Sequence, residues 1–386
     1  MLEGLAQVPW ADLQHAYGCA ADVPDLIRAL RSPDSDAREE ALWELYGNIF
    51  HEGSRYEASA YAVPFLLELA ADPDTPDRGE IVELLTALAI GSDEPWLPGG
   101  FPVAEYRRFT SAGEQLVQDG VEQDSLDGEQ RRQVRAYYEL RAYDAVRAGA
   151  PTLVALVTDR DPSVRAAAAY ALGWLPEESG VSVPALTAAV ADPEPRVAAV
   201  ALVALGLLGA DDDATARVVE AALADERDMV RWGAAIALAG LRGPDADPRV
   251  VAELVHWVGT DTDYESGIPC LAGDMPGYAG QALGQLGEAH AETALDALLA
   301  RLRTVTGGPP VLPVLSAALS WAFPDGQVDD GTPFAALDER QQRLVRVLAE
   351  SPAAWKWDDG DFGNVSVMIS NYGLPYGFQA VCAYIP

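Results

Sequence analysis

A segment of about 33 residues that recurs along the chain is the feature that most constrains the fold. The copies begin at Gly149, Val181, Ala214 and Asp247. Pro151 and Pro184 fall in register between the first two copies. A unit of this length buries its apolar face only against its neighbours, so the sequence predicts a stacked array of similar units.

Each copy has the same order of helix-starting, turn and helix-ending residues. It opens near a proline, breaks at Asp-Pro or Asp-Glu, continues with an arginine and ends an Ala/Leu-rich stretch near a glycine. Proline suits the first turn of a helix and glycine its end, so every copy is predicted to be two helices joined by a short turn. Helical spacing of apolar residues predicts the core positions Leu153, Leu156, Val157, Val164, Ala168, Ala171 and Leu172.

An Asp-to-Arg motif marks the turn and appears as Asp161-Pro-Ser-Val-Arg165, as Asp192-Pro-Glu-Pro-Arg196 and, more loosely, as Asp225 with Arg231. Over residues 149–258 these motifs resemble the HEAT repeats, in particular the shorter bacterial form also found in phycobilin lyases. The resemblance implies an all-α fold, an α-solenoid built as a superhelix of antiparallel helix pairs. It also implies an Asp–Arg ladder between neighbouring units and second helices that line a concave surface.

The same pattern predicts how the chain is divided. Arg38 after Asp36 and Arg78 after Asp77 repeat the motif near the N-terminus, whereas PWLPGGFP interrupts the rhythm and an aromatic C-terminal stretch suits a cap. The predicted segments are N-terminal HEAT-like repeats at 1–91, an insertion with a polar helix at 92–148, regular repeats at 149–258, an irregular loop and degenerate repeats at 259–335, and a C-terminal cap at 336–386.

The charge balance narrows the choice of partner. Lys+Arg number 26 against 60 Asp+Glu, which gives a net charge of −34. Such a field repels phosphate backbones and anionic lipid and attracts basic molecules. We therefore expect a basic protein partner and neither nucleic acid nor a membrane, while the oligomeric state stays open. A second interpretation is that the acidity only keeps an Ala/Leu-rich protein soluble.

The location is predicted from what the sequence lacks. Cys19, Cys270 and Cys382 are odd in number and far apart, which argues against disulfides and a zinc knuckle. The start shows no basic region followed by an apolar core, and the longest apolar run, 197–210, is too short to cross a bilayer. We expect a cytoplasmic protein, and Lys356 as the sole lysine gives a composition similar to that of high-GC bacteria.

The usual signatures of enzymes are missing. The histidines are His15, His51, His256 and His290. None of them has the spacing of a metal-binding helix, and neither Gly-x-Ser-x-Gly nor a phosphate loop is present. No cofactor and no metal are predicted.

One acidic stretch has some likeness to a calcium loop. Asp261, Asp263 and Glu265 alternate, but Ser266 and Ala272 stand where such a loop needs glycine and glutamate. The pattern favours a solvated acidic loop.

The densest polar and aromatic cluster runs from residue 46 to residue 57. His51 with Glu52 or Glu57 has the spacing for a general acid/base pair, and Arg55 is suited to holding an anion, so His51 and Glu57 are the catalytic candidates. Alternatively, these side chains satisfy backbone groups at helix ends where one repeat turns into the next.

Large side chains on or after the second helices are the candidates for partner binding, because aromatic residues supply much of the energy of interfaces. The candidates are Trp43, Tyr46, His51, Arg55, Tyr56, Tyr170, Trp174 and Trp232. The alternative is that the aromatic rings pack between repeats. Tyr170 and Trp174, four residues apart, are predicted to share one helical face.

Two functions follow. The first is a non-catalytic scaffold or inhibitor whose acidic surface grips a basic protein, for instance an immunity protein against a basic toxin. The second is a HEAT-like enzyme, such as a lyase or a DNA-glycosylase-like protein. For a glycosylase, the Arg-rich stretch RRQVRAYYELRAYDAVR is the only local basic patch, and Glu139 and Asp144 reduce its charge.

Overall fold

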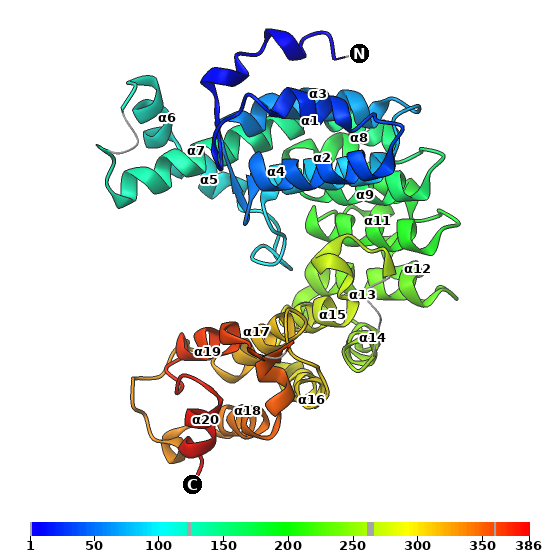
Figure 1. The fold of residues 1–386 in the computed structure, drawn as a ribbon. Helices are drawn as coiled ribbons and strands as arrows, with labels where there is room; N and C mark the ends of the chain where they lie inside the picture. Colours follow the sequence, from blue (N-terminus) through cyan, green and yellow to red (C-terminus); the bar gives the residue numbers. More distant parts are fainter. Residues whose placement is uncertain (1, 122–124, 261–265, 359) are drawn as a thin grey trace. The chain divides into compact units, whose positions relative to one another are not determined.

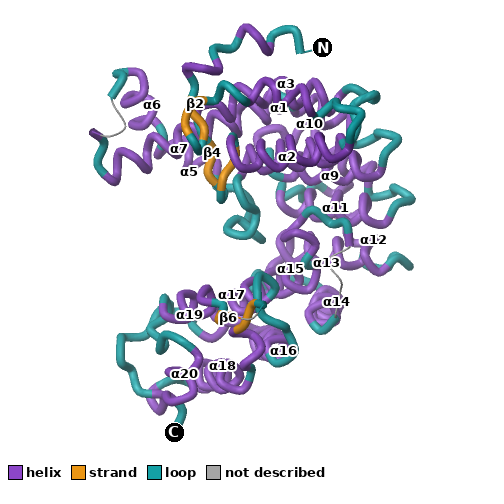
Figure 2. The backbone as a smooth tube through the Cα atoms, in the orientation of Figure 1, coloured by secondary structure: helices purple, strands orange, loops and turns teal. Residues whose placement is uncertain are grey.

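The computed structural model describes residues 2–121, 125–260, 266–358 and 360–386. It is mostly helical, with three short hairpins as its sheets in the described residues (Figure 2). The chain forms two compact units, Met1–Ala210 (unit 1) and Asp211–Pro386 (unit 2). The fold class is the expected one, an all-α solenoid of paired helices.

Unit 1 holds most of the candidate residues. Its elements are β1 (Gln14–His15), β2 (Gly18–Cys19), α1 (Val23–Ala29), α2 (Ser35–Asn48), β3 (Phe50–His51), β4 (Ser54–Arg55), α3 (Glu57–Ala71), α4 (Arg78–Ile90), α5 (Val103–Phe109), α6 (Ser111–Gln118), α7 (Gly128–Ala148), α8 (Ala150–Leu156), α9 (Pro162–Gly173), α10 (Ser179–Ala189) and α11 (Pro195–Leu207).

The helices of unit 1 stack as pairs. α1 packs on α2, α3 on α4, α8 on α9 and α10 on α11. The second helices form a row in the order α2, α4, α9 and α11 (Figure 1). Small residues let neighbouring second helices approach closely. A Cβ on Gly173 would lie 2.9 Å from Cα of Ala204 on the next helix.

The core follows the predicted period. Of the seven predicted positions, all are buried, from Leu153 and Val164 at 0% exposure to Leu156 at 5%. The prediction that each first helix begins near a proline is confirmed for Pro151, which lies in the first turn of α8. It is wrong for Pro184, because α10 already begins at Ser179 and the proline lies inside the helix.

The predicted Asp–Arg ladder is present at Arg165, with one change of residue. It is interrupted at Arg196, whose Nε has no acceptor, while Asp225 is held by Arg227. Arg165 makes two hydrogen bonds to Asp192 of the next repeat, at 2.7 and 2.9 Å, and its Nη1 donates to the carbonyl of Asp159 at 2.9 Å. Asp161 does not join the ladder, because it caps α9 by accepting from the backbone N of Ser163 at 2.9 Å. The ladder carboxylate of that turn is Asp159.

The ladder also crosses the segment predicted as an insertion. Arg78 on α4 holds both oxygens of Asp159, each at 2.7 Å, although 81 residues separate the two positions. α4 accordingly packs directly on α9, while α5, α6 and α7 lie outside the row of second helices (Figure 1). The polar helix expected in this segment is α7, which packs against α3 and α4. The five-segment division itself stays a prediction.

Unit 2 repeats the pairing on its own. Its elements are α12 (Asp213–Ala222), α13 (Asp228–Arg242), α14 (Pro248–Val258), α15 (Met275–Leu283), α16 (Ala291–Leu302), α17 (Val311–Ala322), α18 (Glu339–Glu350), β5 (Lys356–Trp357), β6 (Gly360–Asp361), α19 (Gly363–Ser370) and α20 (Phe378–Tyr384). Arg231 continues the ladder there, because its Nη1 donates to the Asp225 carbonyl at 2.9 Å and its Nε lies 3.4 Å from Glu253.

Across the described residues of both units, the structure contains no helix whose length and apolar character would let it span a bilayer.

Candidate functional site

The predicted polar and aromatic cluster folds into the hairpin β3–β4, directly after α2. The turn residues Glu52 and Gly53 have φ of +48° and +81°. Positive φ at both positions is what a two-residue type I′ turn requires. The hairpin lies beside β1–β2 (Figure 2), where the ring of His51 packs edge-on against Tyr17 at 5.4 Å. The turn places Arg55 in the interior, where it is 3% exposed.

His51 and Glu57 engage different partners. The His51 ring lies against Tyr17, whereas Oε2 of Glu57 accepts a hydrogen bond from the backbone N of Gln14 at 3.3 Å. In the described residues, no hydrogen bond or ion pair joins His51 to Glu52 or Glu57. The structure therefore does not bring the two catalytic candidates together as an acid/base pair.

Arg55 is a buried cation whose hydrogen bonds are incomplete. Its Nη1 donates to the carbonyl of Gly53, but Nε and Nη2 have no hydrogen-bond acceptor. Oε2 of Glu139 lies 3.9 Å from Nη2, which is close enough for charge attraction and too far for a hydrogen bond. Burial lowers the pKa of Arg55, and the nearby Glu139 opposes this shift. At the end of α4, Gly91 leaves room for the guanidinium, because a Cβ there would lie 2.5 Å from Nη1.

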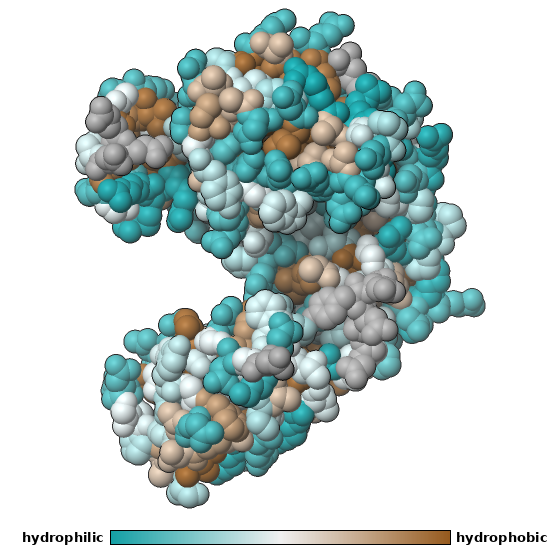
Figure 3. Space-filling view, in the orientation of Figure 1, coloured by the Kyte–Doolittle hydropathy of each residue, from teal (hydrophilic) through white to brown (hydrophobic). Residues whose placement is uncertain are grey.

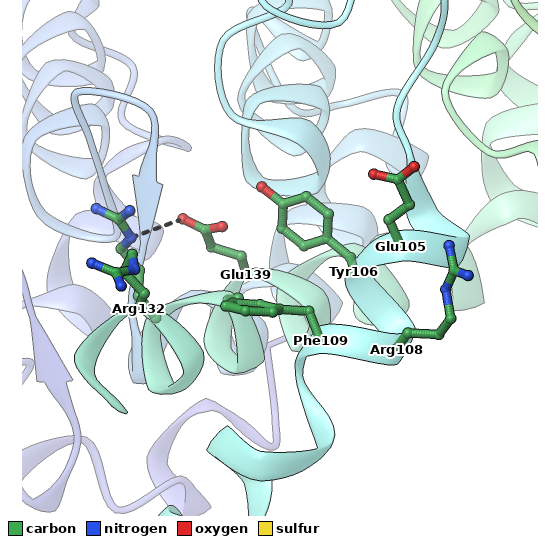
Figure 4. A pocket seen from close by; sticks show the side chains of 8 residues that line it. Glu105, Tyr106, Arg108, Phe109, Arg132 and Glu139 are labelled. Atoms are coloured by element: carbon green, nitrogen blue, oxygen red, sulfur yellow. Dashed lines mark ion pairs between the residues drawn. The ribbon is translucent and has the colours of Figure 1, made fainter. Parts of the chain in front are cut away.

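Glu139 on α7 is the centre of this polar group. Its side chain is 9% exposed, and Nε of Arg135 lies 3.9 Å from Oε1. Burial raises the pKa of Glu139, and Arg55 and Arg135 act against that rise. The Tyr106 hydroxyl faces the carboxylate (Figure 4), and burial together with this carboxylate raises the pKa of Tyr106. Such a group can orient a bound polar molecule.

A cavity of about 640 Å³ opens between α5 and α7 beside Glu139. Phe109, which is 43% exposed, and Ala136 give it an apolar wall, while Arg108, Arg132 and Arg135 bring positive charge to it (Figure 4). Its size falls within the range of small-molecule pockets, roughly 300–1,000 Å³. The walls suit a ligand that combines an apolar body with a polar group.

Three of the predicted contact residues on second helices belong to the core. Trp174 and Trp232 are 0% exposed and Tyr170 is 4% exposed. Trp232 donates its Nε1–H to the carbonyl of Met275 at 3.1 Å. The rings of Tyr170 and Trp174 do share a face, with centroids 5.7 Å apart. Their expected place on a binding surface is thus corrected, because these rings fill the space between helices, as the alternative interpretation predicted.

Trp43 and Tyr46 differ from these three. Trp43 on α2 is 75% exposed, and Tyr46, one turn further on, packs its ring edge-on against Phe50 at 5.8 Å. Burial raises the pKa of Tyr46, and Glu83 and Glu80 on α4 raise it further. Tyr46 therefore lies next to carboxylates of the following repeat, and Trp43 is exposed one turn before it on the same helix.

These carboxylates are crowded by like charges. Burial raises the pKa of Glu80, and so do Asp77 and Glu39. Burial and Glu80 also raise the pKa of Glu83, although solvent reaches its side chain. We call the surface formed by Glu39, Trp43, Tyr46, Glu80 and Glu83 the acidic face. In Figure 3, the visible side of unit 1 is mostly hydrophilic, with small hydrophobic patches between.

Metal binding has no counterpart in the described residues, where no three His, Cys, Asp or Glu side chains converge on one point. The stretch compared with a calcium loop, Asp261 to Glu265, lies outside the described residues.

Sequence reasoning missed Tyr106, Arg135 and Glu139 as neighbours of Arg55. The sequence shows the Arg-rich stretch, but its charge alone indicates only a basic patch. The available signal was an arginine four residues before a glutamate on a helix with several tyrosines. Nothing in the local pattern shows that this helix covers a hairpin some 80 residues earlier.

Comparison with known proteins gives a family for the regular repeats. Residues 126–206 and 183–266 each match the family described as HEAT repeats. The comparison with curated proteins finds no significant match.

Solved structures of repeat proteins resemble the chain at low similarity. A chain of the CpcE–CpcF complex of phycocyanin lyase from Nostoc sp. PCC7120 has 18% identity and a TM-score of 0.42, covering 76% of this chain and 91% of that one. A designed armadillo repeat protein in complex with the peptide (KR)4 has 17% identity and a TM-score of 0.36, with coverages of 73% and 100%. Kap121p bound to Pho4p has 16% identity and a TM-score of 0.36, with coverages of 85% and 35%.

Proposed function

We propose that this chain, whose residues 126–206 and 183–266 match the HEAT repeats, is a non-catalytic binding scaffold whose acidic face engages a basic protein. The observation that carries the proposal is the acidic face on α2 and α4. There, an exposed tryptophan and a half-buried tyrosine lie among carboxylates that repel one another.

The chemistry of this face fits arginine and lysine side chains. A cation over an exposed aromatic ring gains about 0.5–1 kcal/mol, and a desolvated one gains more. Burial raises the pKa of Glu80 and of Glu83, and neighbouring carboxylates raise them further, so a cation on the face would relieve that repulsion. The net charge of −34 adds long-range attraction for the same partner.

The ladder arginine of α2 neutralises the face only in part, because Arg38 acts against the rise in the pKa of Glu80 that burial, Asp77 and Glu39 cause. Arg38 pairs with Asp77 at 2.6 Å and donates to the carbonyl of Ser32 at 2.9 Å. The hydrogen bonds of Arg38 go to the turn of its own repeat and to Asp77 of the next repeat, and none goes to Glu80 or Glu39. These two carboxylates therefore still repel each other.

The test is a titration of the full chain with a fluorescent Arg/Lys-rich peptide at low and at physiological ionic strength. We expect the affinity to fall steeply with salt. We expect Trp43→Ala to weaken binding about tenfold, the loss of one anchor at the centre of an interface. The matched control is Trp357→Ala, an exposed tryptophan (54%) outside the acidic face, for which we expect less than about a twofold change.

A second pair of variants separates local from overall charge. Glu80→Gln with Glu83→Gln removes two charges from the acidic face, while Asp329→Asn with Asp330→Asn removes two exposed charges elsewhere. We expect only the first pair to lower the affinity strongly. Equal losses from both pairs, or from both tryptophan variants, would refute a role for this face.

A further inference from the structure

A second cavity, of about 320 Å³, lies where the hairpin β3–β4 meets α7. Its lining includes Arg55, Tyr56, Arg131, Val134, Arg135 and Tyr138. It shares Arg135 with the larger cavity and none of its residues with the acidic face.

The charge of this cavity is opposite to that of the chain. Three arginines and no carboxylate are among its lining residues, in a protein with a net charge of −34. Glu139 is the nearest anion named by the ion pairs of Arg55 and Arg135, and it is 3.9 Å from each. Glu57 and Glu52 act on the lining tyrosines Tyr138 and Tyr56, but neither carboxylate lines the cavity, so positive charge prevails at the lining itself.

The guanidinium donors here are largely unused. Nε of Arg131 donates to the carbonyl of Leu126 at 3.0 Å, and Nε and Nη2 of the buried Arg55 have no acceptor. Arg107, which contacts the opposite half of α7, is fully engaged by Asp144 at 2.5 and 3.0 Å and by Glu177 at 2.8 and 3.1 Å. Within one insertion, some arginines are therefore saturated by carboxylates while those around the cavity are not.

Tyrosines complete the cavity. Burial, reinforced by Glu57, raises the pKa of Tyr138 to about 12, so its hydroxyl stays protonated and able to donate at neutral pH. Burial also raises the pKa of Tyr56. Their rings and the buried Val134 provide apolar and stacking surface beside the cations.

We propose that this cavity binds a small aromatic oxyanion, a carboxylate or phosphate group carried on an aromatic body. The oxyanion accepts hydrogen bonds from Arg131, Arg135 and the Tyr138 hydroxyl, with Arg55 supplying a buried charge behind them. The fork of donors on arginine matches the oxygens of both groups. The aromatic body lies against the tyrosine rings. The volume is at the small end of ligand pockets, which favours a single ring.

The test is calorimetric titration of the full chain with phenyl phosphate, benzoate and inorganic phosphate, each at an ionic strength held constant with sodium chloride. We expect saturable binding of at least one aromatic probe, and tighter binding of phenyl phosphate than of inorganic phosphate. Comparing phenyl phosphate with benzoate tells which oxyanion the site prefers. Arg131→Ala and Arg135→Ala are each expected to weaken the preferred probe about tenfold, the loss of one charge-assisted hydrogen bond.

Arg132→Ala is the matched control. Arg132 lies between the two test residues in sequence, but it lines the larger cavity and not this one. We expect less than about a twofold change. All three side chains are exposed, so the variants should fold, which circular dichroism checks.

The absence of saturable binding to wild-type protein would overturn the proposal, and so would an equal loss in Arg132→Ala, which would indicate diffuse attraction. Equal affinity for inorganic and phenyl phosphate would overturn the aromatic part of the assignment. Trp43→Ala should leave this binding unchanged, so the two sites can fail independently.

Discussion

The regular stack of α8–α11 and the insertion of α5–α7 use the same residue types in different ways. In the stack, Arg165 is consumed by the ladder, with hydrogen bonds to Asp192 and to the carbonyl of Asp159, and the rings of Tyr170 and Trp174 are buried. In the insertion, Arg131 and Arg135 are exposed beside cavities, and Phe109 is 43% exposed.

The difference has a physical cause. A helix inside the stack has neighbours on both sides, so its large and charged side chains become part of the contacts between repeats. α7 packs on α3 and α4 but lies outside the row, and its N-terminal half carries the exposed arginines that line the two cavities. Arginine and aromatic side chains therefore stay available for binding on helices that are not packed between two repeats.

The largest expected effect tests the burial of aromatic rings in the row of second helices. Trp174→Ala removes a side chain with 0% exposure and should lower the free energy of unfolding by about 3–5 kcal/mol. Trp43→Ala removes a ring that is 75% exposed and should change it by no more than about 0.5 kcal/mol. Urea unfolding of the full chain, followed by circular dichroism, measures both. Similar losses in the two variants would erase the distinction between core and surface rings.

The ladder gives the next effect in size. Arg78→Ala leaves Asp159 without its two 2.7 Å hydrogen bonds and should cost about 2–3 kcal/mol, because a partly buried carboxylate loses its counter-charge. The control is Arg249→Ala, whose pair with Asp247 is exposed and lies within one turn, so we expect no measurable change. Urea unfolding of both variants, followed by circular dichroism, measures the two changes in the free energy of unfolding. A negligible effect at Arg78 would mean that the stack does not depend on this bridge.

The pH dependence of stability tests whether the effect of Arg78→Ala comes from its ion pair with Asp159. Arg78 lowers the pKa of Asp159 below its ordinary value of 3.8. The pair therefore stabilises the fold fully above that value, and its contribution is lost as the pH falls through the lower pKa of the folded state. The difference between wild-type protein and Arg78→Ala should be largest at neutral pH and shrink once the pH falls below 3.8. A difference that grows in acid would contradict the assignment to this carboxylate.

The smallest effect concerns how the insertion is attached. The Arg141 guanidinium on α7 lies over the ring of Tyr61 on α3, 5.3 Å from its centroid. Arg141→Ala should cost about 0.5–1 kcal/mol, the usual contribution of a cation over an exposed ring. Arg132→Ala is the reference, since the only pair of Arg132 in the described residues is with Glu129, three residues away on the same helix. Limited proteolysis near α7 provides a second measurement, and equal cleavage of both variants would argue against this contact.

Much of the fold was predictable from the sequence. The period, the Asp-Pro turns and the alternation of apolar residues identify the helix pairs and the buried positions from Leu153 to Leu172. These signals are local, since they depend on helical spacing and on capping preferences over a few residues. The ladder was predicted in kind, and Asp192 of the motif is the acceptor of Arg165. In the preceding turn the acceptor is Asp159 and not Asp161, because the two residues stand in the same turn and only the backbone shows which one caps α9.

The candidate site was predictable only in part. The sequence pointed to residues 46–57, and the structure places His51 against Tyr17, Glu57 on Gln14 and Arg55 under α7. None of these neighbours can be inferred from spacing, since each depends on how separate elements pack. The aromatic residues of the second helices all look alike in sequence, yet the structure buries Trp174 and exposes Trp43.

By itself, the sequence determined that this protein is a stack of helix pairs with a net charge of −34, because periodicity and charge are properties of the chain. Only the tertiary structure decided which charges remain available. Packing brings Arg78 to Asp159 and satisfies both, whereas it buries Arg55 at 3.9 Å from Glu139 and leaves its Nε and Nη2 without an acceptor. Hydrogen bonds act over about 3 Å, so their partners are fixed by folding and not by the order of residues.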